Sequence, residues 1–413
     1  MESRCCLLPD LGFAANYFTF SPDTLHRSAT SACYRGRASI RSERNLRKTR
    51  CIRQRPILLC LTENASNVSD DSSIASYSYT HKRLLVQIER LTSAFPLWVL
   101  GGAVLAVLWP GFFTWVTANV LLVMLCLIML SMGLSTSLDD FRAVCQNPRV
   151  VLFGVLAQFT IMPILGYLFC SVFELEPALR AGLLLVATAP GGTASNVVCQ
   201  LANSNVALSI LMTLSSTCVS VFISPLLMKI LAGSKVSVNA SALFASTLQV
   251  VILPLAAGIF LRSTTPRLVE IANPWLPFLS VICVTLICAS VVSSNVAFFR
   301  AGFPLKLIAS VFLLHAFGFL LGYLVSKLSK YPEETARTVS IEVGMQNSGL
   351  AASLAATHFA SAASHSSLPL ATLPPAISAT MHSLIGSLLA ALWRQYDGKK
   401  RKKTESVEKL DPE

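Results

Sequence analysis

The segment Glu342-Val343-Gly344-Met345-Gln346-Asn347-Ser348-Gly349 places a carboxylate, two side-chain amides and two glycines inside an apolar stretch over residues 332–360. An earlier apolar stretch, residues 177–202, has a similar interruption, Ala189-Pro190-Gly191-Gly192-Thr193-Ala194-Ser195-Asn196. A helix in lipid is normally apolar and continuous, because the bilayer offers no hydrogen-bond partners to an open backbone. The two polar breaks therefore predict discontinuous membrane helices whose unwound segments meet near the midplane and line a solute site.

The composition of the chain excludes a set of soluble domains. Of its 413 residues, 53% are apolar and only 13% are charged, and the mean hydropathy is +0.61. Such values are typical of membrane proteins. The net charge of +12 lies mainly at the ends, because residues 1–60 hold eleven basic and four acidic side chains and residues 394–413 hold seven and five. This distribution does not form a binding face for nucleic acid, and we expect no such partner.

Ten apolar stretches follow residue 94, and each is long enough to cross a bilayer. They cover approximately residues 95–114, 118–138, 149–173, 177–202, 205–231, 240–262, 274–297, 303–328, 332–360 and 369–394. The broken stretches are the fourth of each set of five, which predicts two five-helix repeats of inverted topology. The basic residues of the connections are more numerous on the side of the termini, which places both termini in a matrix or stroma. The expected fold class is an all-α polytopic membrane protein with ten transmembrane helices.

The two ends of the chain predict a targeting segment and a tail. Residues 1–80 are rich in Arg and Ser and poor in acidic residues, which is typical of an organellar transit peptide followed by a disordered linker. A disordered cytosolic tail is the alternative. The ten-helix domain covers residues 92–396, and residues 397–413 are expected to form a basic, disordered tail. The twelve cysteines form no C-x-x-C pair, so neither a zinc site nor a disulfide framework is indicated.

Glu342 is the acidic residue that the pattern places deepest in the bilayer. Counted from Pro332 at ~1.5 Å per residue, it lies roughly 15 Å into a core of ~30 Å. An ionised carboxylate there costs about 2.5 kcal/mol or more, and no Lys or Arg is predicted at the same depth. Either protonation, as in a proton relay, or a bound cation must compensate for this charge.

The neighbours of Glu342 favour a cation, because they are rich in oxygen atoms. These neighbours are Ser195, Asn196 and Gln346 in the two breaks, Ser209 and Thr213 on one face of the fifth stretch, and Gln158 in the third. Gln158 alone is equally consistent with a hydrogen bond between helices, and a serine or threonine often bonds its own helix backbone. The prediction therefore depends on the whole set together with Glu342.

Three segments of the chain resemble the bile acid:sodium symporter family. They are Ala157-Gln158-Phe159-Thr160-Ile161-Met162-Pro163, then residues 190–197 with residues 205–209 and Thr213, and finally residues 342–351. With its basic leader, the chain looks like the plant plastid sodium/metabolite cotransporter (BASS) branch of that family. The resemblance implies a transporter domain built from a core of helices three to five and eight to ten and a panel of helices one, two, six and seven.

The resemblance also implies site residues. One sodium site would use Ser195, Asn196, Ser209, Thr213 and Glu342. A second would use Gln158, Gln346, Glu342 and the backbone carbonyls of Val343 and Met345. The substrate cavity would be bordered by Thr193, Asn347 and His382, where the N-terminal ends of the second half-helices can hold an anion. His315 has no motif behind it and is expected to make a structural contact.

The function implied is sodium-coupled symport of a small organic anion, such as a 2-keto acid, glycolate or pantoate, by alternating access. Na+ would be the coupling ion, no cofactor is expected, and the partners would be an anionic metabolite and membrane lipids. The location would be the plastid inner envelope, with the mitochondrial inner membrane as the alternative. A proton-coupled or uncoupled carrier of the same fold is the alternative function. An enzyme is not expected, because Ser383 and His382 are adjacent on a helix and cannot face each other. The oligomeric state and the identity of the anion stay open.

Overall fold

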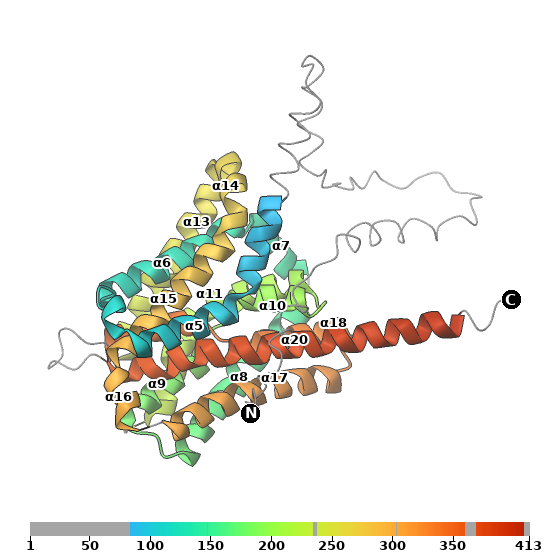
Figure 1. Cartoon of the computed structure of the whole chain (residues 1–413). Coiled ribbons are helices and arrows are strands. Elements are labelled where there is room, and N and C mark those ends of the chain that lie inside the picture. Colours follow the sequence, from blue (N-terminus) through green and yellow to red (C-terminus); the bar gives the residue numbers. More distant parts are fainter. Residues whose placement is uncertain (1–82, 147, 234–237, 303, 360–368, 409–413) are drawn as a thin grey trace, which may run out of the picture. The chain divides into compact units, whose positions relative to one another are not determined.

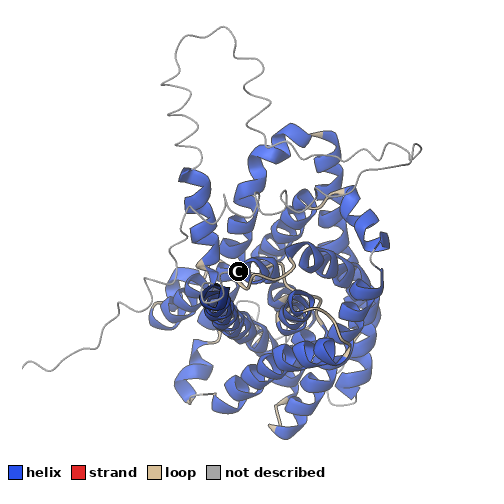
Figure 2. Ribbon diagram, turned by 90° about the vertical axis from the view of Figure 1, so that its right-hand side faces the viewer, coloured by secondary structure: helices blue, strands red, loops and turns tan. Residues whose placement is uncertain are grey.

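The computed structural model describes residues 83–408, except for 147, 234–237, 303 and 360–368. The predicted transit peptide and linker, residues 1–80, lie outside the described residues. The unit that begins at Leu85 is built from α-helices packed side by side (Figures 1 and 2). Apart from one isolated bridge between Gly191 and Gln346, the described residues form no β-structure.

Seven apolar segments of the described chain are long enough to cross a membrane. They are α6 (Ala118–Ser135), α8 (Pro148–Val172), α11 (Val206–Ala232), Ala240–Thr264 with α12 (Ala240–Thr247) and α13 (Leu253–Thr264), Pro266–Ser294 with α14 (Pro266–Ala272) and α15 (Leu276–Ser294), α17 (Leu305–Leu328), and the apolar part of α20 (Leu373–Glu408). An eighth is formed if the helix Arg83–Ser93 and α5 (Phe95–Leu108), bent by 55° at their junction, count together. This agrees with an all-α polytopic membrane protein, whereas the count of ten and the inverted repeat stay predictions.

Both polar segments interrupt their helices at the predicted places. The first separates α9 (Pro177–Thr188) from α10 (Ser195–Leu201), and the second separates α18 (Glu333–Gly344) from α19 (Ser348–His358). The two unwound segments cross and bond to each other, since Gly192 N–H donates to Met345 O at 3.0 Å and Asn347 N–H donates to Pro190 O at 2.8 Å. The backbone groups freed by one break are therefore satisfied by the other, as a buried open backbone requires.

Glycine is needed at this crossing because the two backbones approach so closely. A Cβ at Gly192 would lie 2.7 Å from Gln346 O, and a Cβ at Gly191 would lie 2.7 Å from the Glu342 Oε2 atom. Both separations are shorter than real Cβ contacts, so a side chain at Gly192 would force the two backbones apart, and one at Gly191 would displace the Glu342 carboxylate. Gly192 thus permits the close approach of the two unwound segments, and Gly191 leaves room for the Glu342 carboxylate.

The helices pack in two neighbourhoods around the crossing. The broken helices α9, α10, α18 and α19 pack against α8, α11, α17 and α20, whereas α5, α6, α13 and α15 pack mainly on one another. Contacts of α6 with α19 and of α5 and α15 with α20 join the two neighbourhoods. The division into core and panel domains itself remains a prediction.

Two elements differ from the expectation drawn from the sequence. α20 continues past residue 397 as far as Glu408, where the sequence predicts a disordered tail. This region is rich in Lys, Arg and Glu, which are good helix formers, so an established helix propagates through it. The helix Arg83–Ser93 was also not expected, because its Arg, Gln and Glu residues give it no membrane-span signal.

The close approach at the crossing predicts the effect of Gly192→Ala. The added methyl group should destabilise the fold by about 1–3 kcal/mol, because neither backbone can retreat. The melting temperature of the purified protein in detergent checks this. The control is Gly101→Ala in α5, where a new Cβ meets nothing within 4 Å. Equal losses of stability in the two variants would contradict the explanation.

Candidate functional site

The carboxylate of Glu342 is the centre of a buried cluster of hydroxyl groups. Its side chain lies on α18 and is 2% exposed. Its Oε1 atom accepts hydrogen bonds from Ser195, at 2.5 Å, and from Ser209, and its Oε2 atom accepts one from Thr213 at 2.8 Å. No ion pair to Glu342 is found among the described residues. Three neutral donors therefore stabilise this carboxylate in place of a cationic side chain.

The local sequence explains why these groups meet. Ser209 and Thr213 are four residues apart on α11 and so share one face of that helix. The register of α11 is fixed at its start by Asn205, whose side chain accepts from Leu208 N–H at 2.9 Å. Asn196 completes the set, because its Oδ1 atom lies 2.8 Å from Ser209 Oγ. All five residues predicted for the first ion site are thus brought together.

This set of atoms has the chemistry of a site for a hard monovalent cation. It offers a single charged carboxylate together with hydroxyl and amide oxygens, which are the ligands that hard cations prefer. The described residues hold no group of three His, Cys, Asp or Glu side chains of the kind that binds transition metals. One negative charge and several neutral oxygens would be balanced by one positive charge, so the residues fit Na+.

The residues predicted for the second ion site meet at the end of α18. Gln158 Nε2 donates to Gln346 Oε1 at 2.8 Å and lies 3.2 Å from Ala189 O, and Gln346 Nε2 donates to Val343 O at 2.7 Å. Met345 O accepts from Gly192 N–H instead, and the oxygens of Glu342 bond the hydroxyls of the first set. Gln158 Oε1 is buried and has no partner among the described residues. An acceptor left without a donor fits a nearby cation.

A cavity of about 270 Å³ lies beside the crossing and is bordered by the three residues predicted for the substrate, Thr193, Asn347 and His382. Asn196, Thr213 and Gln346 of the candidate ion sites also line it. No signal in the sequence marks another part of the lining, which includes Phe95, Val99, Ile128, Ser131, Ser280 and Val284. Such apolar and hydroxyl residues look like ordinary helix packing in a sequence.

The cavity is suited to an anion that needs no cationic partner. No Lys or Arg belongs to the described residues that line it. The N-terminus of α19 does border it through Ser348 and Gly349, and Asn347 caps this helix by accepting from Leu350 N–H at 3.0 Å. The positive end of the helix dipole therefore lies at the cavity wall.

A chain of hydrogen bonds links the break in α18 to the cavity. With neutral rings its direction is fixed, because Gly344 O can only accept from His315 Nδ1, at 2.8 Å. His315 Nε2 then accepts from Ser378 at 2.7 Å, Ser378 accepts from Ser348 at 2.7 Å, and Ser348 accepts from His382 Nε2 at 3.2 Å. His315 thus makes the structural contact expected of it, and His382 Nδ1 is left as a buried acceptor without a partner among the described residues.

Comparison with known proteins identifies the class of this protein. Residues 122–301 match the model of the Sodium Bile acid symporter family. The chain is 41% identical over 307 residues to the probable sodium/metabolite cotransporter BASS1, chloroplastic, of Arabidopsis thaliana. The aligned region covers 74% of this chain and 75% of that protein. It is 40% identical over 341 residues to the rice protein named BASS2, covering 82% and 78%. It is 39% identical over 309 residues to the sodium-dependent transporter YocS of Bacillus subtilis, covering 74% and 92%.

The chain therefore belongs to the sodium bile acid symporter family. Its relatives are transporters, which agrees with the expectation that this protein is not an enzyme. The roles of the individual site residues stay predictions, although the geometry brings them together.

The hydrogen-bond chain predicts that Ser378→Ala destabilises the protein by about 1–3 kcal/mol, because a buried acceptor on His315 loses its donor. Unfolding of the purified protein in detergent measures this. The matched control is Ser383→Ala on the same helix, since among the described residues the Ser383 hydroxyl bonds only the carbonyl of Ala379 one turn earlier. If Ser378→Ala is no more damaging than Ser383→Ala, the chain contributes nothing to stability.

Proposed function

We propose that this protein is a sodium-coupled symporter of a small organic anion. The observation that carries the proposal is the carboxylate of Glu342, buried beside the cavity and bonded only to neutral hydroxyl donors among the described residues. The names of the relatives, which are sodium/metabolite cotransporters, support the same function.

The proposed topology has ten transmembrane segments in two inverted repeats. Seven are the long apolar helices, one is the bent pair that includes α5, and two are the broken pairs α9 with α10 and α18 with α19. Neither broken pair counts as one of the long apolar helices, because each is interrupted by an unwound polar segment. The core would contain both broken pairs, and the panel would contain α5, α6, α13 and α15.

The first sodium ion would be held by Ser195, Asn196, Ser209, Thr213 and Glu342. Each hydroxyl now directs its proton toward the carboxylate, and it would rotate so that a lone pair faces the ion instead. The second ion would lie among Gln158, Gln346, Glu342 and the carbonyls of Val343 and Met345, where the unpartnered Gln158 Oε1 supports a cation. Binding of this second ion would break the hydrogen bond between Gln158 and Gln346.

Coupling follows from the position of Glu342 beside the cavity. Asn196 and Thr213 belong both to the first ion site and to the cavity lining. Without sodium, the charge of Glu342 repels an anion in the cavity, whereas bound sodium neutralises it. The anion would then bind at the N-terminus of α19 with Asn347, Thr193 and His382. Movement of the core against the panel would expose the cavity to each side in turn.

The size of the cavity supports a small substrate. About 270 Å³ suits a compact monocarboxylate such as a 2-keto acid, glycolate or pantoate better than a steroid. We place the protein in the inner envelope membrane of the plastid, because the basic leader and the chloroplastic relatives BASS1 and BASS2 point to that organelle. The mitochondrial inner membrane is the alternative location.

Glu342→Gln tests the ion site. Proteoliposomes with the wild-type protein should concentrate a labelled monocarboxylate when a sodium gradient is imposed, and the variant should lose this stimulation, because its neutral amide cannot balance the ion. The control is Glu334→Gln, the same substitution at an exposed position of the same helix. Sodium-driven uptake by Glu342→Gln at the wild-type level would refute the assignment. Uptake that follows a pH gradient and ignores sodium would favour the proton-coupled alternative.

Asn347→Asp tests the anion site. An aspartate can still cap α19, but it adds a negative charge to the cavity wall. At ~8 Å this charge costs about 2 kcal/mol with an effective dielectric constant of 20, so KM for the anion should rise by more than about tenfold. Asn347→Ser, which keeps a neutral cap, should have a much smaller effect. An unchanged KM in Asn347→Asp would show that the anion binds elsewhere.

A further inference from the structure

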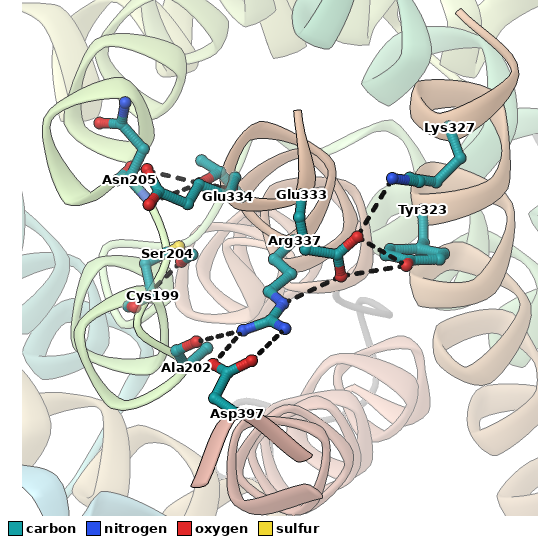
Figure 3. A network of polar contacts seen from close by, with 11 residues as sticks. Cys199, Ala202, Ser204, Asn205, Tyr323, Lys327, Glu333, Glu334, Arg337 and Asp397 are labelled. Atoms are coloured by element: carbon teal, nitrogen blue, oxygen red, sulfur yellow. Dashed lines mark hydrogen bonds and ion pairs between the residues drawn. The ribbon is translucent and has the colours of Figure 1, made fainter. Parts of the chain in front are cut away.

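A polar network near the N-terminus of α18 attaches the turn between α10 and α11 to this helix (Figure 3). These three helices carry the five residues proposed for the first sodium site. The ligand oxygens are therefore correctly spaced only if the three helices keep their relative positions. The turn, residues 202–205, is the place where α10 ends and α11 begins, so its attachment to α18 constrains both helices at once.

Arg337 attaches the end of α10. Its side chain is 4% exposed, and its Nη1 atom donates to Ala202 O, at the C-terminus of α10, at 3.3 Å. The guanidinium group is oriented by a bidentate ion pair with Asp397 of α20, at 2.7 and 2.8 Å. Its Nε atom donates to Glu333 at 3.1 Å, and the ring of Trp393 lies 5.5 Å away. Four N–H groups of the planar arginine fork are thus directed to named oxygens, an arrangement that a lysine could not make.

Thr338 attaches the start of α11. Its Oγ1 atom accepts from Asn205 N–H at 3.0 Å, and its single proton is directed to Glu334 O at 2.8 Å, with Asn205 O more distant at 3.3 Å. Asn203, inside the turn, has a φ of 50°, the left-handed conformation that often ends a helix at an asparagine. The turn is therefore a defined structure that presents fixed backbone groups to α18.

These attachments lie one helical turn from the proposed ion ligands. Thr338 precedes Glu342 by four residues on α18, and Asn205 precedes Ser209 by four residues at the start of α11. Four residues of helix span ~6 Å, so each attachment is directly above a ligand on the same face. A change in the spacing of the helices at the turn is consequently transmitted to the distances between the ligand oxygens.

We infer that Arg337 and Thr338 are positioning residues that set the sodium affinity of the first site by docking the α10–α11 turn on α18. This inference rests on the proposed function. Asp397 acts through Arg337, and this gives α20 a reason to continue as a helix past its apolar part. Neither residue belongs to the proposed ion sites or to the described lining of the cavity.

The network lies wholly within the proposed core. Its members come from α10, α11, α17, α18 and α20, and none comes from α5, α6, α13 or α15 among the described contacts (Figure 3). Movement of core against panel would leave it intact, so loss of the network changes ion affinity more than the rate of the cycle. A changed ion affinity distinguishes a positioning role from a purely structural one. Loss of a purely structural contact would lower the amount of folded protein and leave its sodium dependence unchanged.

Thr338→Val is the first test, because it removes the hydroxyl and keeps the shape. The sodium concentration for half-maximal uptake should rise on the order of tenfold, as for other residues that orient metal ligands, while uptake at saturating sodium stays near wild type. Thr338→Ser, which keeps the hydroxyl, should restore the wild-type value. Sodium-dependent thermal stabilisation in detergent, without substrate, should shift in parallel.

Asp397→Asn is the second test, made at a half-exposed position so that folding is preserved. It should raise the half-saturating sodium concentration in the same direction. Its control is Arg142→Gln, which removes an exposed ion pair outside the network, to Asp139 at 2.8 Å, and should change nothing. If uptake by the wild-type protein depends on sodium, and both Thr338→Val and Asp397→Asn have the wild-type half-saturating sodium concentration, the inference is wrong and the proposed function stands. If wild type shows no sodium dependence, the proposed function fails, and the inference with it.

Discussion

The burial of one carboxylate constrains the rest of this structure. Glu342 is 2% exposed, and a charge in such a place is tolerated only when hydrogen bonds surround it. The donors come from Ser195 at the start of α10 and from Ser209 and Thr213 on α11, so three helices must converge on one point. This convergence leaves no room for a side chain at Gly191, whose Cβ would lie 2.7 Å from the carboxylate. The electrostatic requirement thus explains the helix packing and the glycine.

The same convergence places the candidate ion and anion sites side by side. Both helices are unwound where they cross, and the freed backbone groups of Pro190, Gly192, Met345 and Asn347 bond to each other. The second half-helices therefore begin at the crossing, with their N-termini at the cavity. An ion next to Glu342 and an anion next to α19 would consequently share a few residues, and their charges would attract through a region of low dielectric constant.

The sequence alone was sufficient to predict the features that depart from an apolar, continuous membrane helix. Glu342, the two polar breaks and the hydroxyls of α11 stand out because charged and polar groups are costly in lipid. Ile128 and Val284 of the cavity lining could not be found, since apolar residues in an apolar helix carry no signal of their position. The pair Arg337 and Asp397 was missed for another reason: it joins residues 60 positions apart, and the charged composition after residue 397 predicts disorder. Only the packing of α20 against α18 brings them together.

α18 is held at both of its ends, and this determines what ion binding can change. At its start, Arg337 and Thr338 bond the α10–α11 turn, and at its end Gly344 O accepts from His315 of α17. Glu342 lies between these two attachments, so its position is set before any ion arrives. At the proposed first site, ion binding would then require hydroxyl rotation rather than helix movement, which would keep the reorganisation small. The free energy of ion binding would thereby be available to neutralise Glu342 beside the cavity and to favour the proposed anion. The proposed movement of core against panel would also require a rigid core, because the proposed ion ligands would have to stay together while the cavity opens first to one side and then to the other.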